Sequence, residues 1–195
     1  PSIAPTPAAL VTTDAFFADG VTPDGRWTEL SGSASGDGLA INSPLALEPS
    51  VATASDGSRY AAWAEMRHGN FEIFVARWTQ TGGWEQIDNS AESGGISNTP
   101  TASRRPAITV DDQNRPIVAW TEFSSTGATS NVRVARYDTG SDNWQLLSSG
   151  LSGGTDADDA RIAMTDVGPV VAWLEGQSVL LKRFNSPSWQ AIDGS

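Results

Sequence analysis

A short motif recurs three times along the chain and constrains its fold more than any other feature. The motif is Ala-Trp-x-Glu, with its tryptophans at Trp63, Trp120 and Trp173, which are 57 and 53 residues apart. Each copy is followed by an arginine with an aromatic neighbour and then by one more tryptophan: Arg77-Trp78 and Trp84, Arg136-Tyr137 and Trp144, Arg183-Phe184 and Trp189. A period of this length marks repeated supersecondary units, here about 45 to 60 residues long.

Each unit has the pattern of short antiparallel strands. Apolar and polar residues alternate in segments bounded by Gly, Pro, Asn, Asp and Ser, and no segment predicts a helix. In the clearest unit we expect strands at 106–110, 116–122, 131–137 and 144–147. Four antiparallel strands per unit, repeated radially, describe a β-propeller blade. We therefore predict an all-β, β-propeller-type array; a β-sandwich is the alternative, but it does not explain a tryptophan in every fourth strand.

The repeat also predicts how the chain is divided. We expect a proline-rich extended arm or linker at 1–14, a half blade at 15–30, full blades at 31–87 and 88–147, and a shortened blade at 148–195. Closed propellers commonly use four to eight blades, so about three and a half blades form an incomplete ring. We therefore expect self-association, or further blades of a longer chain, to cover the two flanks.

The composition excludes several classes of function. The chain has 23 acidic and 12 basic residues, a net charge of −11, and Lys182 as its single lysine. This charge argues against a nucleic-acid partner. No apolar run approaches the ~20 residues that cross a bilayer, so we expect no direct membrane insertion. The absence of cysteine excludes disulfides and thiol catalysis, and a single histidine, His68, leaves little room for histidine-dependent chemistry.

Two segments carry a family resemblance. Residues 33–38 and 90–98 each lead into an alternating stretch that ends in Ala-Trp-x-Glu and then Arg-aromatic. This arrangement resembles a tandem repeat of bacterial surface and secreted proteins, whose repeats in turn resemble sialidase-like and lectin-like propellers. The resemblance covers about residues 27–193 and implies an extracellular or cell-surface location, but no established activity. The chain departs from the pattern at Ala54, where the counterpart of Asp111 is expected, and in a tighter turn at 166–168.

Recurring charged residues are expected to build the blades. They are Glu65, Glu122 and Glu175 at the ends of the second strands, and Arg77, Arg136 and Arg183 on the third. The sialidase resemblance implies three arginines from different blades around a substrate carboxylate. Here the arginines share one repeated position, so we expect them to pair with nearby acids instead. Sequence motifs of hydrolases, nucleotide-binding proteins and zinc proteases are missing, and we predict that the chain is not an enzyme.

Non-recurring residues point better to a specific site, because the scaffold does not require them. We predict a ligand site from the hydrogen-bonding groups of one hairpin loop, nearby flat aromatic faces and an aromatic residue of the counterpart loop: Arg67, His68, Asn70, Tyr60, Trp78 and Phe123. An ordinary hairpin loop is the alternative. The ligand that this chemistry fits is a glycan.

A cluster of acidic residues offers the oxygen ligands that calcium prefers. Asp156, Asp158 and Asp159 lie close together in a flexible stretch, and Asp111 with Asp112 forms a weaker candidate. A solvated acidic surface is the alternative. We expect no other cofactor.

These observations lead to a prediction of function. We predict a noncatalytic extracellular β-propeller module for adhesion, surface display or self-assembly. The first alternative is a lectin-like carbohydrate-binding module, and the second is a sialidase-like glycoside hydrolase.

Overall fold

The computed structural model describes residues 29–36, 38–41, 43–88, 90, 94–153 and 156–192, and their regular structure consists of strands. The strands are β1 (Ala46–Thr53), β2 (Arg59–Arg67), β3 (Asn70–Thr79), β4 (Gly83–Glu85), β5 (Ser103–Val110), β6 (Pro116–Phe123), β7 (Ser130–Asp138), β8 (Asn143–Ser148), β9 (Ala157–Thr165), β10 (Gly168–Glu175), β11 (Ser178–Asn185) and β12 (Ser188–Ala191). Among the described residues no helix is long and apolar enough to cross a membrane.

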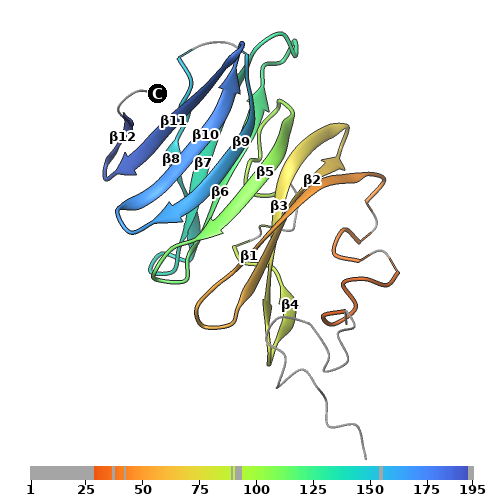
Figure 1. The fold of residues 1–195 in the computed structure, drawn as a ribbon. Helices are drawn as coiled ribbons and strands as arrows, with labels where there is room; N and C mark the ends of the chain where they lie inside the picture. Colours follow the sequence, from red (N-terminus) through yellow and green to blue (C-terminus); the bar gives the residue numbers. More distant parts are fainter. Residues whose placement is uncertain are drawn as a thin grey trace, which may run out of the picture.

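The strands form three four-stranded antiparallel sheets, each joined in sequence order: β1 to β4, β5 to β8 and β9 to β12. Figure 1 shows the sheets lying beside one another as a fan, in the order of the chain. The first strands of neighbouring sheets are in contact, β1 with β5 and β5 with β9. These inner strands therefore line the axis of an open, propeller-type array, and the predicted fold class is confirmed. We call the sheets the first, second and third blades.

The register confirms the equivalences that the repeat predicted. Trp84, Trp144 and Trp189 on the outer strands pair with the aromatic residues that follow the recurring arginines: Trp78, Tyr137 and Phe184. Paired residues on neighbouring strands point to the same face of a sheet, so each outer strand is held by an aromatic pair. The turn after β5 also forms as expected, since the Asp111 side chain accepts hydrogen bonds from the backbone N–H groups of Gln113 and Arg115.

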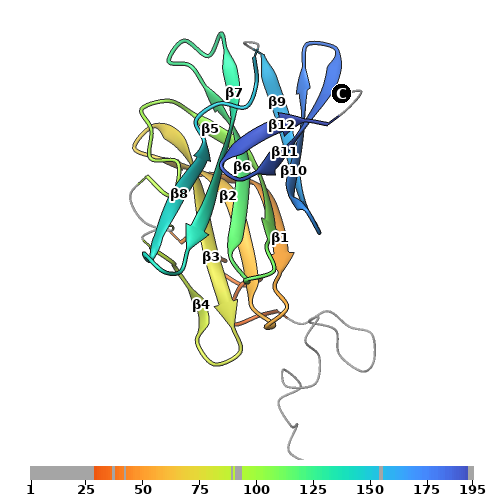
Figure 2. The same ribbon diagram turned by 90° about the vertical axis from the view of Figure 1, so that its left-hand side faces the viewer.

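Neighbouring blades pack a tryptophan face against a small-residue face. Trp120 of the second blade lies in one core cluster with Ala62 and Ala64 of the first, and Trp173 of the third lies in another with Ala119 of the second. Figure 2 shows the same three blades turned by 90° about the vertical axis. Alanine at the contact makes room for the indole ring of the next blade. The hydrophobic core therefore lies between blades rather than within any one of them.

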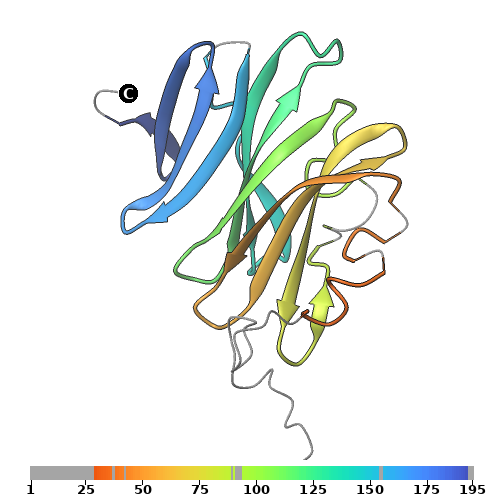
Figure 3. The same cartoon turned by 45° about the vertical axis from the view of Figure 1, so that its right-hand side comes forward.

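The N-terminal part of the predicted division lies outside the described residues. This concerns the arm at 1–14 and, except for residues 29 and 30, the half blade at 15–30. Residues 39 and 40, which precede β1, pack against the tryptophan face of the first blade at Trp63. Figure 3 shows the segment before β1 running along this flank.

Candidate functional site

Each inner strand carries a β-bulge at the same place, directly opposite the recurring tryptophan. The pairing shifts between Leu47 and Ser50 in β1, between Arg104 and Ala107 in β5, and between Asp158 and Arg161 in β9. In every blade, two residues of the inner strand therefore lie opposite one residue of the second strand. A bulge of this kind bends its strand and re-aims a side chain.

The first bulge residue is charged in all three blades and adopts a left-handed backbone conformation. The φ angles are 57° at Glu48, 56° at Arg105 and 50° at Asp159. For residues other than glycine this conformation is uncommon and costs about 1 to 3 kcal/mol, and such residues concentrate at functional sites. The bulge itself recurs and belongs to the scaffold. The side chain on it changes from acid to base to acid, which the scaffold does not require.

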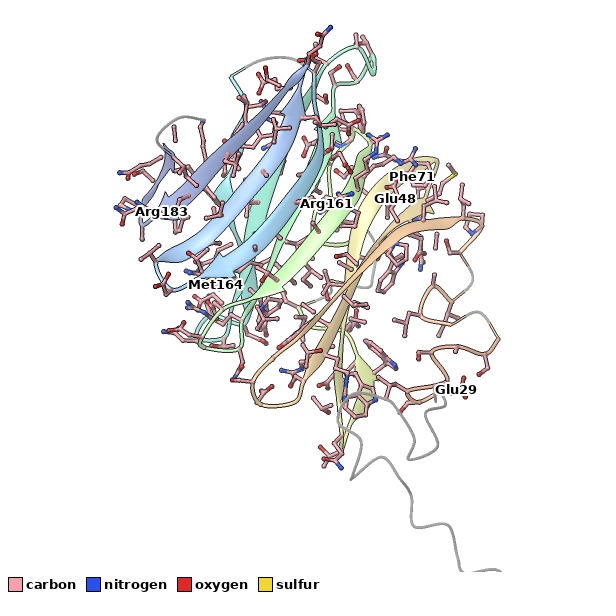
Figure 4. The ribbon with its side chains drawn as sticks, in the orientation of Figure 1. Glu29, Glu48, Phe71, Arg161, Met164 and Arg183 are labelled. Atoms are coloured by element: carbon pink, nitrogen blue, oxygen red, sulfur yellow. The ribbon has the colours of Figure 1, made fainter. Side chains whose placement is uncertain are left out.

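These three side chains meet at the axis. They line a cavity of about 370 Å³ together with the neighbouring bulge residues: Glu48, Pro49, Ser50, Arg105, Pro106, Ala107, Asp159 and Arg161. We call it the axial cavity. Figure 4 labels Glu48 on β1 and Arg161 on β9, the inner strands of the first and third blades. Residues from all three blades therefore contribute to one site.

Glu48 is the most tightly held carboxylate of the axial cavity. Its Oε1 accepts a hydrogen bond of 2.8 Å from Nη2 of Arg104, and its Oε2 accepts one of 2.7 Å from the backbone N–H of Arg105. The guanidinium of Arg104 also lies over the ring of Phe71, 4.7 Å from its centroid. Because both oxygens of Glu48 accept from charged or backbone donors, its orientation is set before any ligand arrives.

Arg105 connects the acids on either side of it. Its Nε lies 4.0 Å from Oε1 of Glu48 in the first blade, and its Nη1 donates to Oδ1 of Asp158 in the third. Asp159 is paired separately, with Oδ1 2.7 Å from Nη2 of Arg161. That pair is open to water, since the Arg161 side chain is 63% exposed. Exposed pairs contribute little to stability, so Asp159 and Arg161 can exchange partners more easily than Glu48 can.

The ligand site predicted from the aromatic faces and the first hairpin loop does not come together. Tyr60 and Trp78 lie at one end of the β2–β3 hairpin, and Arg67 lies at the other. Tyr60 and Arg67 are seven residue steps apart along β2, which corresponds to roughly 23 Å. The members of the set in the first blade thus occupy its two opposite ends, and Phe123 lies in the second blade.

Most members of that set have structural partners. The hydroxyl of buried Tyr60 donates to the carbonyl of Asn114 at 3.0 Å, and the indole N–H of Trp78 donates to Oγ of Ser31 at 3.2 Å. The first contact ties the first blade to the second, and the other ties it to the segment before β1. Both aromatic residues are almost fully buried, so neither offers a free face to a sugar ring.

Two residues of the hairpin loop are also held by structural partners. Arg67 donates to the buried carboxylate of Glu65, and Nδ2 of Asn70 donates to the carbonyls of Thr99 and Thr101. His68 is exposed in the turn, with a φ of 51°. Phe123 lines a separate polar depression of about 230 Å³ on the second blade. The hairpin-loop alternative therefore describes this part of the molecule better than a shared ligand site does.

The three aspartates of the predicted calcium site contact different partners. Asp158 accepts from Arg105 and Asp159 pairs with Arg161, while Asp156 stands at an isolated bridge to Ser130. No group of three acidic or histidine side chains within the described part of the chain is arranged to hold a metal ion. Asp111, from the weaker candidate, pairs with Arg115 at 2.7 Å.

The recurring charged residues have mixed surroundings. The carboxylates of Glu65 and Glu175 accept from the indole N–H of the tryptophan two residues earlier, at 2.7 and 2.8 Å, whereas Glu122 accepts from Arg133 at 2.8 Å. Arg77 pairs with Glu85 at 2.8 Å, as expected of an arginine that builds the blade.

Sequence reasoning missed Glu48, Arg104, Arg105 and Arg161. The first strand of the second blade was predicted to begin at Pro106, which placed the two arginines before it outside the sheet. In fact β5 begins at Ser103 and the proline lies in the bulge. A usable signal was present: a charged residue directly before proline at the same place in two units, Glu48-Pro49 and Arg105-Pro106.

The fold is similar to that of enzymes that act on glycans, although no protein-family model and no curated protein sequence matches this chain. A glycosyl hydrolase from Bacteroides ovatus shares 12% identity and a TM-score of 0.50, over 75% of this chain and 48% of that one. The sialidase of Trypanosoma rangeli shares 8% identity and a TM-score of 0.51, over 75% and 28%. An exo-β-1,3-galactanase from Phanerochaete chrysosporium shares 14% identity and a TM-score of 0.50, over 88% and 39%. Identities this low show a common fold alone, and the chain spans about half or less of these proteins.

These similarities contradict the prediction of a noncatalytic module, and with it the prediction that the chain is not an enzyme. The solved structures that share the fold are named as a glycosyl hydrolase, a sialidase and a galactanase. The error has a physical reason. In this fold the charged groups of a site come one at a time from separate blades, so the absence of a contiguous catalytic motif excludes nothing.

Proposed function

We propose that these blades are part of a glycoside hydrolase that binds its substrate at the axial cavity. One observation carries the proposal: carboxylates of the first and third blades, Glu48 and Asp159, converge with Arg105 and Arg161 on one cavity. Its volume of about 370 Å³ lies in the range typical of small-molecule sites. The glycan-directed enzymes that share the fold support this choice of substrate class.

The two acids have surroundings that suit different tasks. Glycoside hydrolysis commonly uses one carboxylate to activate water or stabilise positive charge, and one carboxylic acid to protonate the leaving oxygen. Glu48 is suited to the first task, because Arg104 and the Arg105 amide hold its carboxylate in one orientation. Asp159 is suited to the second, because its partner Arg161 is exposed and a substrate oxygen can take the place of the guanidinium beside the Asp159 carboxyl group.

Arg105 and Arg161 would bind the substrate through hydrogen bonds to its oxygens, since guanidinium groups present several donors in a fixed plane. The resemblance to repeats of surface and secreted proteins is consistent with a hydrolase that acts outside the cell, on glycans it meets there. That location stays a prediction.

The test is turnover by the full chain on a panel of 4-nitrophenyl glycosides and polysaccharides, with binding measured by calorimetry. For a cleaved substrate, we expect Glu48→Gln and Asp159→Asn each to lower kcat/KM by about 100-fold or more. The matched control is Asp166→Asn, in the exposed turn between β9 and β10. It should leave turnover unchanged.

Circular dichroism of each variant separates loss of chemistry from loss of fold, because Glu48 also joins the first and second blades. Binding of a glycan at the axial cavity without turnover would contradict the hydrolase and favour the lectin-like alternative. If no glycan of the panel is bound or cleaved, both the hydrolase and the lectin-like alternative are contradicted.

A further inference from the structure

One face of the third blade is built like two faces that lie buried elsewhere in the molecule. The register makes Ala172, Leu174 and Val179 of the third blade equivalent to Ala119, Thr121 and Val132 of the second and to Ala62, Ala64 and Ile73 of the first. In every blade these residues lie on the face that points away from the blade's own recurring tryptophan. We call this surface of the third blade the third-blade face.

The equivalent positions differ sharply in exposure. Ile73 and Val132 are completely buried, whereas Val179 is 61% exposed. Thr121 is likewise buried, and Leu174 at the same place is 45% exposed. The third-blade face thus exposes apolar side chains at the positions where the other blades are covered. Such a surface is costly to leave in water.

The molecule itself shows what covers this kind of face. The small-residue face of the first blade is covered by Trp120 with Ile108 and Val118 of the next blade. That of the second blade is covered by Trp173 with Val171 and Ala160. In both cases the occupant is a four-stranded antiparallel blade that presents a tryptophan from its second strand, and Ala172 leaves room for a third such ring.

We infer that the third-blade face is a docking surface for one further blade of this chemistry. A second copy of this chain fits less well, because the tryptophan face it would offer, at Trp63, is already packed against Leu39 and Ala40. Two chains of net charge −11 also repel one another. The inference does not depend on the proposed function.

Docking would also extend the axial cavity. Inner strands of successive blades lie in contact, β1 with β5 and β5 with β9, so the inner strand of the added blade would lie beside β9. There it would meet Arg161, the most exposed arginine of the axial cavity. The added blade would therefore supply the next wall of that cavity.

The test extends the full 195-residue chain at its C-terminus with a second copy of residues 88–147, which brings one more blade with its tryptophan. We expect the melting temperature to rise above that of the parent chain by at least about 5 °C, because the added blade buries the exposed face. Leu174→Lys and Val179→Lys should abolish this rise. In the parent chain the same substitutions should leave the melting temperature nearly unchanged, because both side chains are exposed there.

The matched control is Val167→Lys, another exposed apolar residue of the third blade that lies in the turn after β9. It should leave the rise intact. The inference is overturned if the extended chain melts no higher than the parent, or if the rise survives Leu174→Lys and Val179→Lys. Sedimentation of the parent chain adds one more outcome: a dimer that Leu174→Lys dissociates would assign the surface to a second copy and overturn the inference as stated.

Discussion

The two tyrosines show how burial changes the pKa of single side chains in this fold. Tyr137 is buried and donates its hydroxyl hydrogen to the carboxylate of Asp142. Burial, and then the hydrogen bond and negative charge of Asp142, raise the pKa of Tyr137 to about 12. Burial also raises the pKa of Tyr60 above its ordinary value of 10.0. Each phenol is thereby held in its neutral form.

At the scale of the residue, we predict that the tyrosine phenols ionise at a higher pH in the folded chain than in the unfolded chain. As the folded chain is brought through pH 10, its phenolate absorbance should rise little, and Tyr137 should ionise only near pH 12. A folded-state pKa above the unfolded value means that this stabilisation is complete below pH 10 and is lost as the pH approaches 12. Tyr137→Phe should remove the last step. Asp142→Asn should shift that step to lower pH, and ordinary titration of both tyrosines near pH 10 in the folded protein would contradict the assignment.

At the scale of elements, the blade is an incomplete unit that becomes stable through its neighbours. The tryptophan of one second strand fills the space above the alanine of the preceding second strand, as Trp120 does above Ala62. Trp120 is 1% exposed. Its indole N–H has no hydrogen-bond acceptor among the described residues. Its role is therefore apolar packing between blades.

Truncation of this side chain should be among the most damaging single changes. We expect Trp120→Ala to lower the free energy of unfolding by about 3 to 5 kcal/mol, because it opens a cavity between two blades. Trp120→Phe should cost clearly less, since phenylalanine keeps most of the apolar contact and no hydrogen bond is lost. Leu146→Ala on the exposed face of β8 is the control and should change stability by less than about 0.5 kcal/mol. Urea unfolding measures all three, and a similar small loss for Trp120→Ala would contradict the packing role.

At the scale of the whole molecule, the blades are not equally protected. The second blade is covered on both faces, by the first and the third. Among the described residues the third is covered on one face only, and its last strand, β12, is a short edge strand. Local opening is easiest where few buried contacts resist it.

Native-state hydrogen exchange should follow this order. We expect the slowest exchange in β6 and β7 at the centre of the second blade, and faster exchange in β11 and β12. Mass spectrometry of peptides from the full chain measures it. Uniform protection across the second and third blades would show that the open flank is stabilised in some other way.

The sequence by itself determined the blade and its repetition, and the tertiary structure decided the site. Alternation of apolar residues, turn chemistry and the recurring aromatic pairs act between near neighbours, so Trp144 opposite Tyr137 could be predicted from the pattern alone. Glu48, Arg105 and Asp159 meet because three bulges, each in a different blade, turn toward one axis. No local rule requires a left-handed glutamate or arginine inside a strand. The charges that surround the axial cavity therefore became visible only when the blades were assembled.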